Sequence, residues 1–310
     1  MKLLSIVIPC FNEEEVIPFY YDEMTKTLKD FKEKYPDVEI EMIYVDDGSR
    51  DRTLSLIKSY AEKDERVRYV SFSRNFGKEA ALYAGFENSK GDYVVCMDVD
   101  LQDPPALLPE MYEAVINEGY DSAATRRVTR KGEPLIRSFF ARRFYRLMDK
   151  ICQTEVVDGA RDYRIMTRQM TDAVLSMGDY CRFTKGIYGW VGFRTKWLEF
   201  ENIERVAGET KWSFWKLLIY AIEGIIAFST FPLEVISWIG GILSFLFLIF
   251  SVAGGILLHL KVWSTLPLII GVIGFFSSLN LFFLGIAAWY LSKTYLETKN
   301  RPMYVAKEMT

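Results

Sequence analysis

Apolar and polar residues alternate with two different periods along the first 125 positions. Short apolar runs predict β-strands at residues 4–8, 40–45, 67–72 and 93–97. Between these runs, the apolar positions follow a helical period and predict helices at residues 14–34, 53–61 and 78–88. Strands that alternate with helices build a mainly parallel sheet with helices on both faces. The N-terminal part of the chain is therefore predicted to be an α/β domain.

Polar residues cluster where the predicted strands end. The four clusters occupy residues 9–13, 46–51, 73–78 and 98–103. Ligands of such sheets bind beyond the carboxyl ends of the parallel strands. We therefore expect the four clusters to form one binding site.

Two long stretches near the C-terminus contain no charged residue. They run between Glu234 and Lys261 and between Lys261 and Lys293. A membrane-spanning helix needs about 20 predominantly apolar residues, and both stretches are longer. Two transmembrane helices joined by a short loop are predicted, with both ends of the hairpin on one side of the membrane. The alternative is a soluble core that holds two helices apolar on every face.

Residues 211–231 contain a predicted helix of a different kind. Its polar residues Ser213, Lys216, Tyr220 and Glu223 form a narrow stripe, because they lie three or four positions apart. Such a helix is typical of the membrane interface, and a buried helix of a soluble domain is the alternative. The predicted organisation is an α/β domain (1–210), an interfacial helix (211–231), a transmembrane hairpin (232–292) and a C-terminal tail (293–310).

The first residues lack the pattern of a secretory signal peptide, so we expect the α/β domain in the cytoplasm. The tail carries Lys293, Lys299, Arg301 and Lys307, whereas the short loop carries only Lys261. Positive charge favours the cytoplasmic side of a membrane. The expected location is the cell (inner) membrane, as a multi-pass protein with its α/β domain and tail in the cytoplasm.

The amino-acid composition limits the possible catalytic chemistry more than it limits the possible folds. The 310 residues carry a formal net charge of -3, which gives no general attraction to nucleic acid. The four cysteines are too scattered for a disulfide framework and are expected to be reduced and buried. The single histidine, His259, disfavours a histidine base and a zinc site built from several histidines. Catalysis would have to use carboxylates, cations, amides or a metal held by oxygen.

The glycine motifs of dinucleotide sites and P-loops do not occur in the sequence. Instead, Asp98, Asp100 and Gln102 supply three oxygen ligands on alternate residues after a predicted strand. If the backbone stays extended there, alternate side chains project to one side. Two carboxylates and an amide suit Mg²⁺ or Mn²⁺. An Asp-x-Asp pair alone is a weak signal, but its place at a strand end strengthens the prediction.

The Asp46-Asp47-Gly48-Ser49 segment has two interpretations. It is typical of a turn and N-cap that lead into the next helix. Two adjacent carboxylates at a strand end also suit hydrogen bonds to ribose hydroxyls or a base N–H. Both interpretations stay open at this point.

The segment 126–150 holds nine basic residues against Glu133 and Asp149. A solvated helix face is the ordinary explanation of a charge run. Near an anionic membrane, however, each Lys or Arg gains about 1 kcal/mol. We interpret the segment as facing a membrane and a phosphate group, since two apolar spans and a net acidic chain disfavour nucleic acid.

Five motifs in order carry a resemblance to a known family. They are SIVIPCFNEE from Ser5, YVDDGSRDRT from Tyr44, SRNFGKEAAL from Ser73, MDVDLQDPP from Met97 and GETKWS from Gly208. Together they resemble glycosyltransferase family 2, which has the GT-A fold. Within that family they resemble polyprenyl-phosphate glycosyltransferases, namely dolichyl-phosphate mannose synthases and bacterial undecaprenyl-phosphate glucosyltransferases. The interfacial helix and the two spans also match bacterial members, so the resemblance covers nearly the whole chain.

The resemblance implies roles for individual residues. The nucleotide-sugar site would be lined by Pro9, Phe11, Glu13, Val45, Asp47, Lys78, Asp98 and Val99. The metal would be held by Asp98, Asp100 and Gln102. Phosphates of donor or acceptor would meet Arg126, Arg137, Arg205 and Lys211. The residues nearest the chemistry would be Asp100, Arg126 and Asp162.

The implied reaction is a metal-dependent, inverting transfer of a sugar to polyprenyl (undecaprenyl) phosphate, with glucose from UDP-glucose preferred. Such an acceptor is largely dianionic at neutral pH, because the second pKa of a monophosphate is near 6, and it needs little help from a base. Mannose, N-acetylhexosamine and aminoarabinose fit the same framework. The alternatives are a hydroxyl acceptor, which needs a base, and a non-catalytic membrane partner. The resemblance also implies a homo-oligomer, a tetramer.

Overall fold

The computed structural model describes residues 1–128, 157, 159–180, 182–201, 231–259 and 266–310. These residues fall into two compact units, Met1–Gly224 with Arg301–Thr310 and Ile225–Asn300. The predicted interfacial helix and most of the basic segment 126–150 lie outside the described residues.

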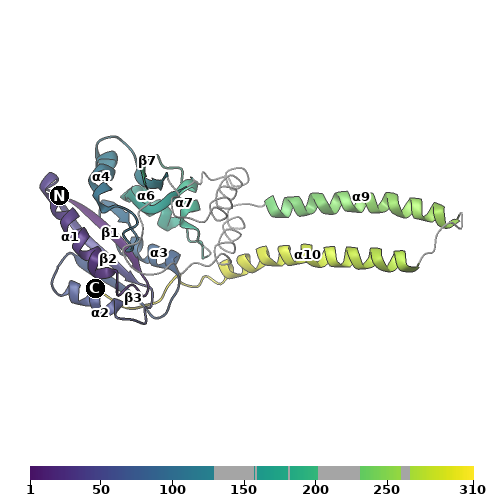
Figure 1. The fold of residues 1–310 in the computed structure, drawn as a ribbon, viewed down its shortest axis with the longest axis horizontal. Helices are drawn as coiled ribbons and strands as arrows, with labels where there is room; N and C mark the ends of the chain where they lie inside the picture. Colours follow the sequence, from purple (N-terminus) through teal and green to yellow (C-terminus); the bar gives the residue numbers. More distant parts are fainter. Residues whose placement is uncertain (129–156, 158, 181, 202–230, 260–265) are drawn as a thin grey trace. The chain divides into compact units, whose positions relative to one another are not determined.

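All the strands and helices expected in the first 125 residues are present (Figure 1). They are β1 (Lys2–Cys10), α1 (Ile17–Lys34), β2 (Val38–Asp46), α2 (Thr53–Ala61), β3 (Val67–Phe72), α3 (Lys78–Asn88) and β4 (Tyr93–Cys96). The expected first helix begins three residues late, because the chain turns at residues 14–16 and a proline occupies the first helical turn, where its missing N–H costs no hydrogen bond.

The chain then adds a short 3₁₀ helix, further strands and helices. They are η1 (Pro105–Leu107), α4 (Leu108–Ile116), β5 (Ser122–Arg127), β6 (Ala160–Thr167), α6 (Arg168–Ser176), α7 (Thr184–Trp190) and β7 (Thr195–Phe200). After the second unit, β8 (Ala306–Met309) returns to the same sheet.

The sheet has eight strands in the order β7-β5-β6-β4-β1-β2-β3-β8. Its centre, β4-β1-β2-β3, is parallel, as the alternation of strands and helices predicts. Antiparallel pairs flank this centre, because β6 runs against β4 and β5, and β8 runs against β3. The sheet is therefore mixed. The prediction of a mainly parallel sheet holds for its four central strands.

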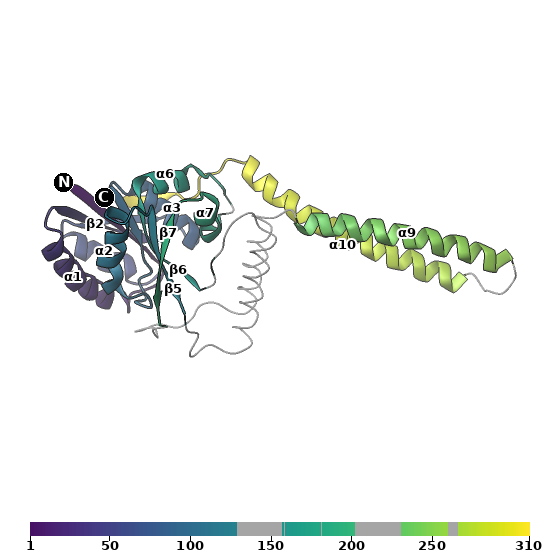
Figure 2. The same cartoon turned by 90° about the horizontal axis from the view of Figure 1, so that it is seen from above.

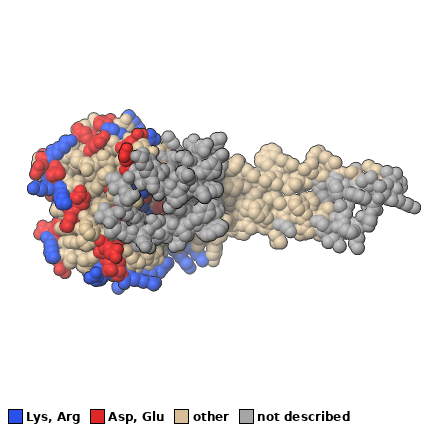
Figure 3. Space-filling view, viewed as in Figure 1, with Lys and Arg blue, Asp and Glu red and all other residues tan. Residues whose placement is uncertain are grey.

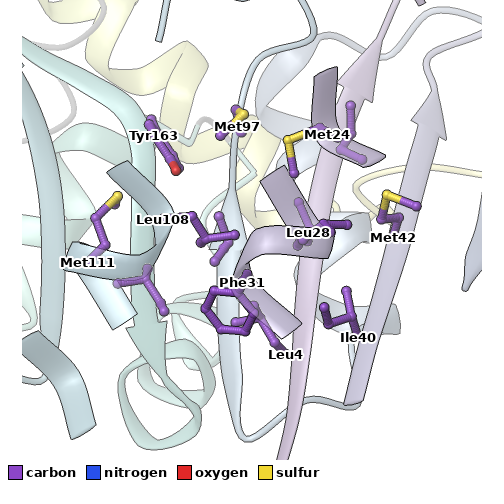
Figure 4. Packing of buried hydrophobic residues seen from close by; sticks show 14 of the residues in the cluster. Leu4, Met24, Leu28, Phe31, Ile40, Met42, Met97, Leu108, Met111 and Tyr163 are labelled. Atoms are coloured by element: carbon purple, nitrogen blue, oxygen red, sulfur yellow. The ribbon is translucent and has the colours of Figure 1, made fainter. Parts of the chain in front are cut away.

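Two apolar clusters hold helices on the two faces of the sheet. One face packs alternate residues of β1 and β2, such as Leu4 and Met42, against Leu28 and Phe31 of α1 (Figure 4). On the other face, Val45 packs against small residues of α3. Figure 2 shows α3, α6 and α7 together on that second face. The side chains alternate between the faces because successive residues of a strand point in opposite directions.

Helix α3 approaches β1 closely at Gly85. A Cβ built on Gly85 would lie 2.0 Å from Val7 Cγ1, a distance that no pair of side chains tolerates. Glycine therefore sets the spacing between the helix and the strand. This spacing matters for the site, because α3 begins at Lys78.

The C-terminal strand was not expected from the sequence, which predicts only a tail after residue 293. In the structure β8 pairs with the edge of β3, with Val70 opposite Met309 and Ser71 opposite Glu308. Lys58 of α2 forms an ion pair with Glu308 at 2.7 Å. Residues 306–309 thus belong to the same sheet as the N-terminal strands.

The second unit consists of α9 (Phe231–His259) and α10 (Leu266–Thr298), which run antiparallel and side by side (Figures 1 and 2). Gly240 of α9 faces α10, since a Cβ there would lie 3.9 Å from Phe283 Cε2. Many apolar side chains of this unit are exposed, such as Trp238 at 74% and Leu281 at 71%. Charged residues gather instead on the first unit (Figure 3).

Of the described residues, Val272–Thr298 is the one helical stretch long and apolar enough to cross a membrane. The apolar stretch found in α9, Phe231–Gly240, is shorter than a span. One of the two predicted spans is therefore matched by this criterion, and the second stays a prediction.

Candidate active site

The loops after β1 and β2 are fastened to each other at the carboxyl edge of the sheet. Asn12 N donates to Ser49 Oγ at 2.9 Å, and Arg50 N donates to Asn12 Oδ1 at 2.8 Å. Gly48 has a φ of +66°, and a Cβ there would lie 2.4 Å from the carbonyl carbon of Arg74. Only glycine allows this turn to approach the loop after β3 so closely. Three of the polar clusters therefore meet, as predicted.

Asp46 and Asp47 point to different partners. Asp46 accepts hydrogen bonds from Ser49 N at 3.1 Å and from Ser71 Oγ at 2.9 Å, which confirms the expected turn. The expected N-cap is wrong, because the N-cap position of α2 is Arg52 and no side chain caps it. Asp47 accepts from Phe76 N at 2.6 Å and Gly77 N at 3.0 Å, and so fixes the loop that precedes α3. Burial raises the pKa of Asp47 to about 6, although these two backbone hydrogen bonds oppose the shift.

Lys78 joins two carboxylates that come from different strands. Its Nζ lies 2.7 Å from Asp98 Oδ1, just after β4, and 2.5 Å from Asp162 Oδ2 on β6. Lys185 of α7 approaches the other oxygen of Asp162, with Nζ 3.7 Å from Oδ1. The result is a compact charged cluster, Lys78–Asp98–Asp162, beside the carboxyl ends of the parallel strands.

The charges in this cluster stabilise one another. Burial opposes the ionised form of Asp162, but the ammonium groups of Lys185 and Lys78 outweigh it and hold the pKa of Asp162 well below its usual value. Burial likewise opposes the charge of Lys78, and the carboxylates of Asp162 and Asp98 raise its pKa above the usual range. Asp162 is therefore an ionised, oriented carboxylate and a poor proton acceptor at neutral pH.

The segment from Asp98 to Gln102 is not extended, contrary to the expectation from its alternate ligands. Strand β4 ends at Cys96, and the chain turns at Val99 and Asp100. Leu101 takes a left-handed φ of 54°, and Gln102 N donates to Asp100 Oδ1 at 3.2 Å. An aspartate that accepts the N–H two residues on stabilises such a turn, which competes with the strand.

An arginine from β6 holds the end of this turn. Arg161 Nε donates to Asp103 Oδ1 at 2.8 Å, and an Nη of Arg161 lies 3.4 Å from Gln102 Oε1. Burial raises the pKa of Asp103 to about 6, and the charge of Arg161 opposes the shift. Arg161 of β6 thus binds one end of the Asp98–Asp103 turn, and its neighbour Asp162 is linked to the other end through Lys78.

A cavity of about 180 Å³ opens among β6, α7 and β7. Its cationic lining comes from Arg161, Arg164 and Lys185. The buried guanidinium of Arg164 lies over the ring of Tyr188 at 4.3 Å and near Trp197 at 5.4 Å. Lys185 lines this cavity and also approaches Asp162, so the cavity adjoins the charged cluster.

The donor set suits a divalent cation that shares its coordination with a substrate. Asp98, Asp100 and Gln102 lie in one turn and offer two carboxylates and an amide oxygen. Within the part of the chain that the structure describes, no group of three or more His, Cys, Asp and Glu side chains is arranged to hold a metal. Mg²⁺ and Mn²⁺ accept such incomplete protein sets, because substrate phosphates supply further oxygens.

The family model of glycosyl transferase family 2 matches residues 5–175, more than half of the chain. The chain belongs to glycosyl transferase family 2. The residues of the cluster, Lys78, Asp98 and Asp162, all lie within the matched part.

Two relatives of this family 2 enzyme match along nearly their whole length. A bactoprenol glucosyl transferase of Shigella phage SfX is 38% identical over 307 residues, which cover 98% of this chain and 98% of the relative. A prophage bactoprenol glucosyl transferase homolog of Escherichia coli is 36% identical over 309 residues, 99% of each chain. The family and these relatives identify the chain as a hexosyltransferase with the GT-A fold.

Among solved structures, the chain is similar to glucosyl-3-phosphoglycerate synthase from Mycobacterium tuberculosis, crystallised with Mn²⁺, UDP-glucose and phosphoglyceric acid. The two chains are 19% identical, the match covers 73% of this chain and 78% of that chain, and the TM-score is 0.46.

The structure distributes the predicted site residues of the glycosyltransferase unevenly. Lys78, Asp98 and Asp162 are in direct contact, as described above. Val45 and Val99 are buried in the apolar clusters, and neither is open to a ligand in this structure. The other residues at this edge of the sheet are Pro9, Phe11, Glu13, Asp47, Asp100 and Gln102.

Of the four predicted phosphate-binding residues, the structure describes one. Arg126 is the last residue but one of β5, and its guanidinium is bound by Glu199 of β7. The remaining three, Arg137, Arg205 and Lys211, lie outside the described residues.

Sequence reasoning placed Asp103 in the 98–103 cluster without giving it a role, and it singled out neither Arg161 nor Lys185. Asp103 and Arg161 stand beside residues that were singled out, and their opposite charges were a usable signal. Lys185 stands in α7 in a segment without a quoted motif, so only the fold brings it to Asp162. Cys10 and Cys96 are free and buried, which confirms the expectation for these two cysteines.

Proposed function

We propose that the protein transfers glucose from UDP-glucose to a polyprenyl phosphate, undecaprenyl phosphate, at the cytoplasmic face of the membrane. The observation that carries the proposal is the full-length match to bactoprenol glucosyl transferases, which spans the apolar helices as well as the glycosyltransferase unit. A relative that shared only the donor-binding domain would not indicate which acceptor the protein uses.

A membrane location with two spans is supported by the strand β8. Because β7 and β8 belong to one sheet, the described residues that precede and follow the two apolar helices lie on the same side of any membrane. The segment between them must then cross an even number of times. Since α10 contains a candidate span, α9 would supply the return crossing. This topology keeps the catalytic unit and the C-terminal tail in the cytoplasm, as positive charge in the tail also favours.

In the proposed reaction, a phosphate oxygen of the acceptor attacks the anomeric carbon of glucose. The bond from that carbon to the β-phosphate oxygen of UDP breaks, and the sugar configuration inverts. A divalent cation on Asp98, Asp100 and Gln102 would neutralise the charge on the departing diphosphate. Lys78 keeps Asp98 and Asp162 in place, and Arg126 would face a phosphate.

The state of Asp162 fits an acceptor that arrives already ionised. Two lysines hold its pKa low, so it is suited to orient charged groups rather than to take up a proton. A phosphate acceptor needs no such uptake, since its second pKa is near 6. A hydroxyl acceptor would need a stronger base than this carboxylate.

The test is mass spectrometry of lipid extracts after the purified full-length protein is incubated with undecaprenyl phosphate, a nucleotide sugar and Mg²⁺ or Mn²⁺. UDP-glucose is expected to give a glucosylated lipid, and UDP-N-acetylglucosamine and GDP-mannose serve as competing donors. No glycolipid with any donor would overturn the proposal. Asp100→Ala is expected to abolish the product, and transfer retained by that variant would refute the metal assignment.

A further inference from the structure

Tyr304 lies just before β8 and joins two elements of the glycosyltransferase unit. Its ring stacks on Phe72, the last residue of β3, with the ring centroids 4.8 Å apart and the planes at 24°. Its hydroxyl donates to Glu87 Oε2 at 2.6 Å and accepts from Asn88 Nδ2 at 3.2 Å. Glu87 and Asn88 end α3, so Tyr304 contacts the last residue of β3 and the last turn of α3 at once.

The segment between these two contacts carries part of the active site. Phe76 packs edge-on against Phe72, with centroids 5.7 Å apart. Phe76 N and the next amide, Gly77 N, bind the carboxylate of Asp47. Lys78 then begins α3 and reaches Asp98 and Asp162. A shift of this segment would move the one ammonium group that touches both carboxylates.

The backbone around Tyr304 is itself fixed to the sheet. Ser73 N donates to Val305 O at 3.0 Å, directly after β3. Glu308 pairs with Lys58 further along, and Thr310 N donates to Tyr69 O at 3.1 Å. The backbone on both sides of Tyr304 is therefore fixed to the sheet. Tyr304 can in turn restrict the movement of the β3–α3 connection.

We propose that Tyr304 is a positioning residue for the donor site, acting through Phe72 and α3 on Lys78. The C-terminal segment that follows α10 thereby takes part in binding the nucleotide sugar, although it touches none of the residues Asp98, Asp100 and Asp162. The inference rests on the proposed function, because its probe is the UDP–Mn²⁺ pair.

The test compares three variants of the full-length protein by calorimetric titration with UDP in the presence of Mn²⁺. Tyr304→Leu fills the space but lacks a flat ring and a hydroxyl, and it is expected to weaken UDP binding about tenfold. Tyr304→Phe keeps the stacked ring and is expected to stay within about threefold of the wild type. Lys307→Ala, at an exposed position of β8, serves as the control and is expected to bind as the wild type does.

An effect on the donor site that exceeds the effect on the acceptor site distinguishes a positioning role of Tyr304 from a general loss of folding. The KM for UDP-glucose is expected to rise in Tyr304→Leu by a larger factor than the KM for undecaprenyl phosphate. Equal UDP binding in Tyr304→Leu and Lys307→Ala would overturn the inference, and so would an equal rise in both KM values. If the wild type binds UDP but forms no glycolipid, the proposed function fails, and the UDP titrations still decide the role of Tyr304.

Discussion

Lys78 donates a hydrogen bond to Asp162 at 2.5 Å, although 84 positions separate the two residues. The same ammonium binds Asp98 at the end of β4. One cation therefore links the turn expected to hold the metal with a carboxylate expected near the reacting centre. Several measurable consequences follow from this pairing and from the packing around it.

Replacing Lys78 by methionine leaves two neighbouring carboxylates without their shared partner. We expect transfer to fall at least about a hundredfold, because both Asp98 and Asp162 lose their orientation. The loss of stability should be about 1–2 kcal/mol, below the value for a fully buried pair, because 38% of the Lys78 side chain is exposed. Thermal unfolding and initial rates measure the two effects, with Lys63→Met at an exposed site as the control. Wild-type activity in Lys78→Met would contradict the proposed role.

Asp162→Asn separates an orienting role from that of a general base. We expect kcat to fall about tenfold, whereas loss of a general base costs typically about 10²–10⁴-fold. The reason is that the acceptor phosphate is already ionised. Transfer of labelled glucose to undecaprenyl phosphate measures the rate. Asp172→Asn, at a side chain that is 61% exposed, is the matched control. Complete loss of turnover in Asp162→Asn alone would indicate that a base is needed.

The raised pKa of Asp47 predicts a dependence of stability on pH. Its folded value is about 6, against an ordinary value of 3.8. This carboxyl therefore favours folding most below about pH 4, and the contribution is lost as the pH rises through 6, by up to about 2 kcal/mol. Asp47→Asn should flatten the change of the thermal midpoint between pH 4.5 and 7.5. Asp37→Asn, at an exposed turn, is expected to keep the wild-type slope, and equal slopes in all three proteins would refute the assignment.

The close approach of α3 to β1 can be tested by a paired substitution. Gly85→Ala would place a methyl group against Val7, and we expect a loss of about 1–3 kcal/mol from overpacking. Val7→Ala in the same chain should restore much of that loss, because it removes the clashing methyl groups. Gly178→Ala meets no atom within 4 Å and is the control. Additive effects of Gly85→Ala and Val7→Ala in urea unfolding would show that the two positions do not interact.

The centre of the fold could be predicted because its signals are local. Each central strand is a short apolar run, and each polar cluster directly follows one. Parallel pairing then places the ends of β1, β2, β3 and β4 at one edge without further information. The position of Asp98 beside the binding site was predictable for this reason.

The remaining features depend on contacts between distant residues. Strand β8 has the sequence AKEM, with two charges in four residues, and it becomes a strand only because the edge of β3 is available. The turn at Leu101 depends on Asp100 accepting the amide of Gln102 and on Arg161 holding Asp103. Neither the apolar pattern nor the motif spacing contains these pairings. The ion pair of Lys78 with Asp162 is of the same kind.

The place of β8 in the sheet has a consequence for the order of synthesis. Its four residues are made only after both apolar helices have been made. Until then, β3 remains an open edge, and the nascent enzyme cannot complete its sheet. A chain that stops early therefore exposes a strand edge, which is a site for aggregation and proteolysis. The sheet is therefore complete only in a chain that already contains both apolar helices.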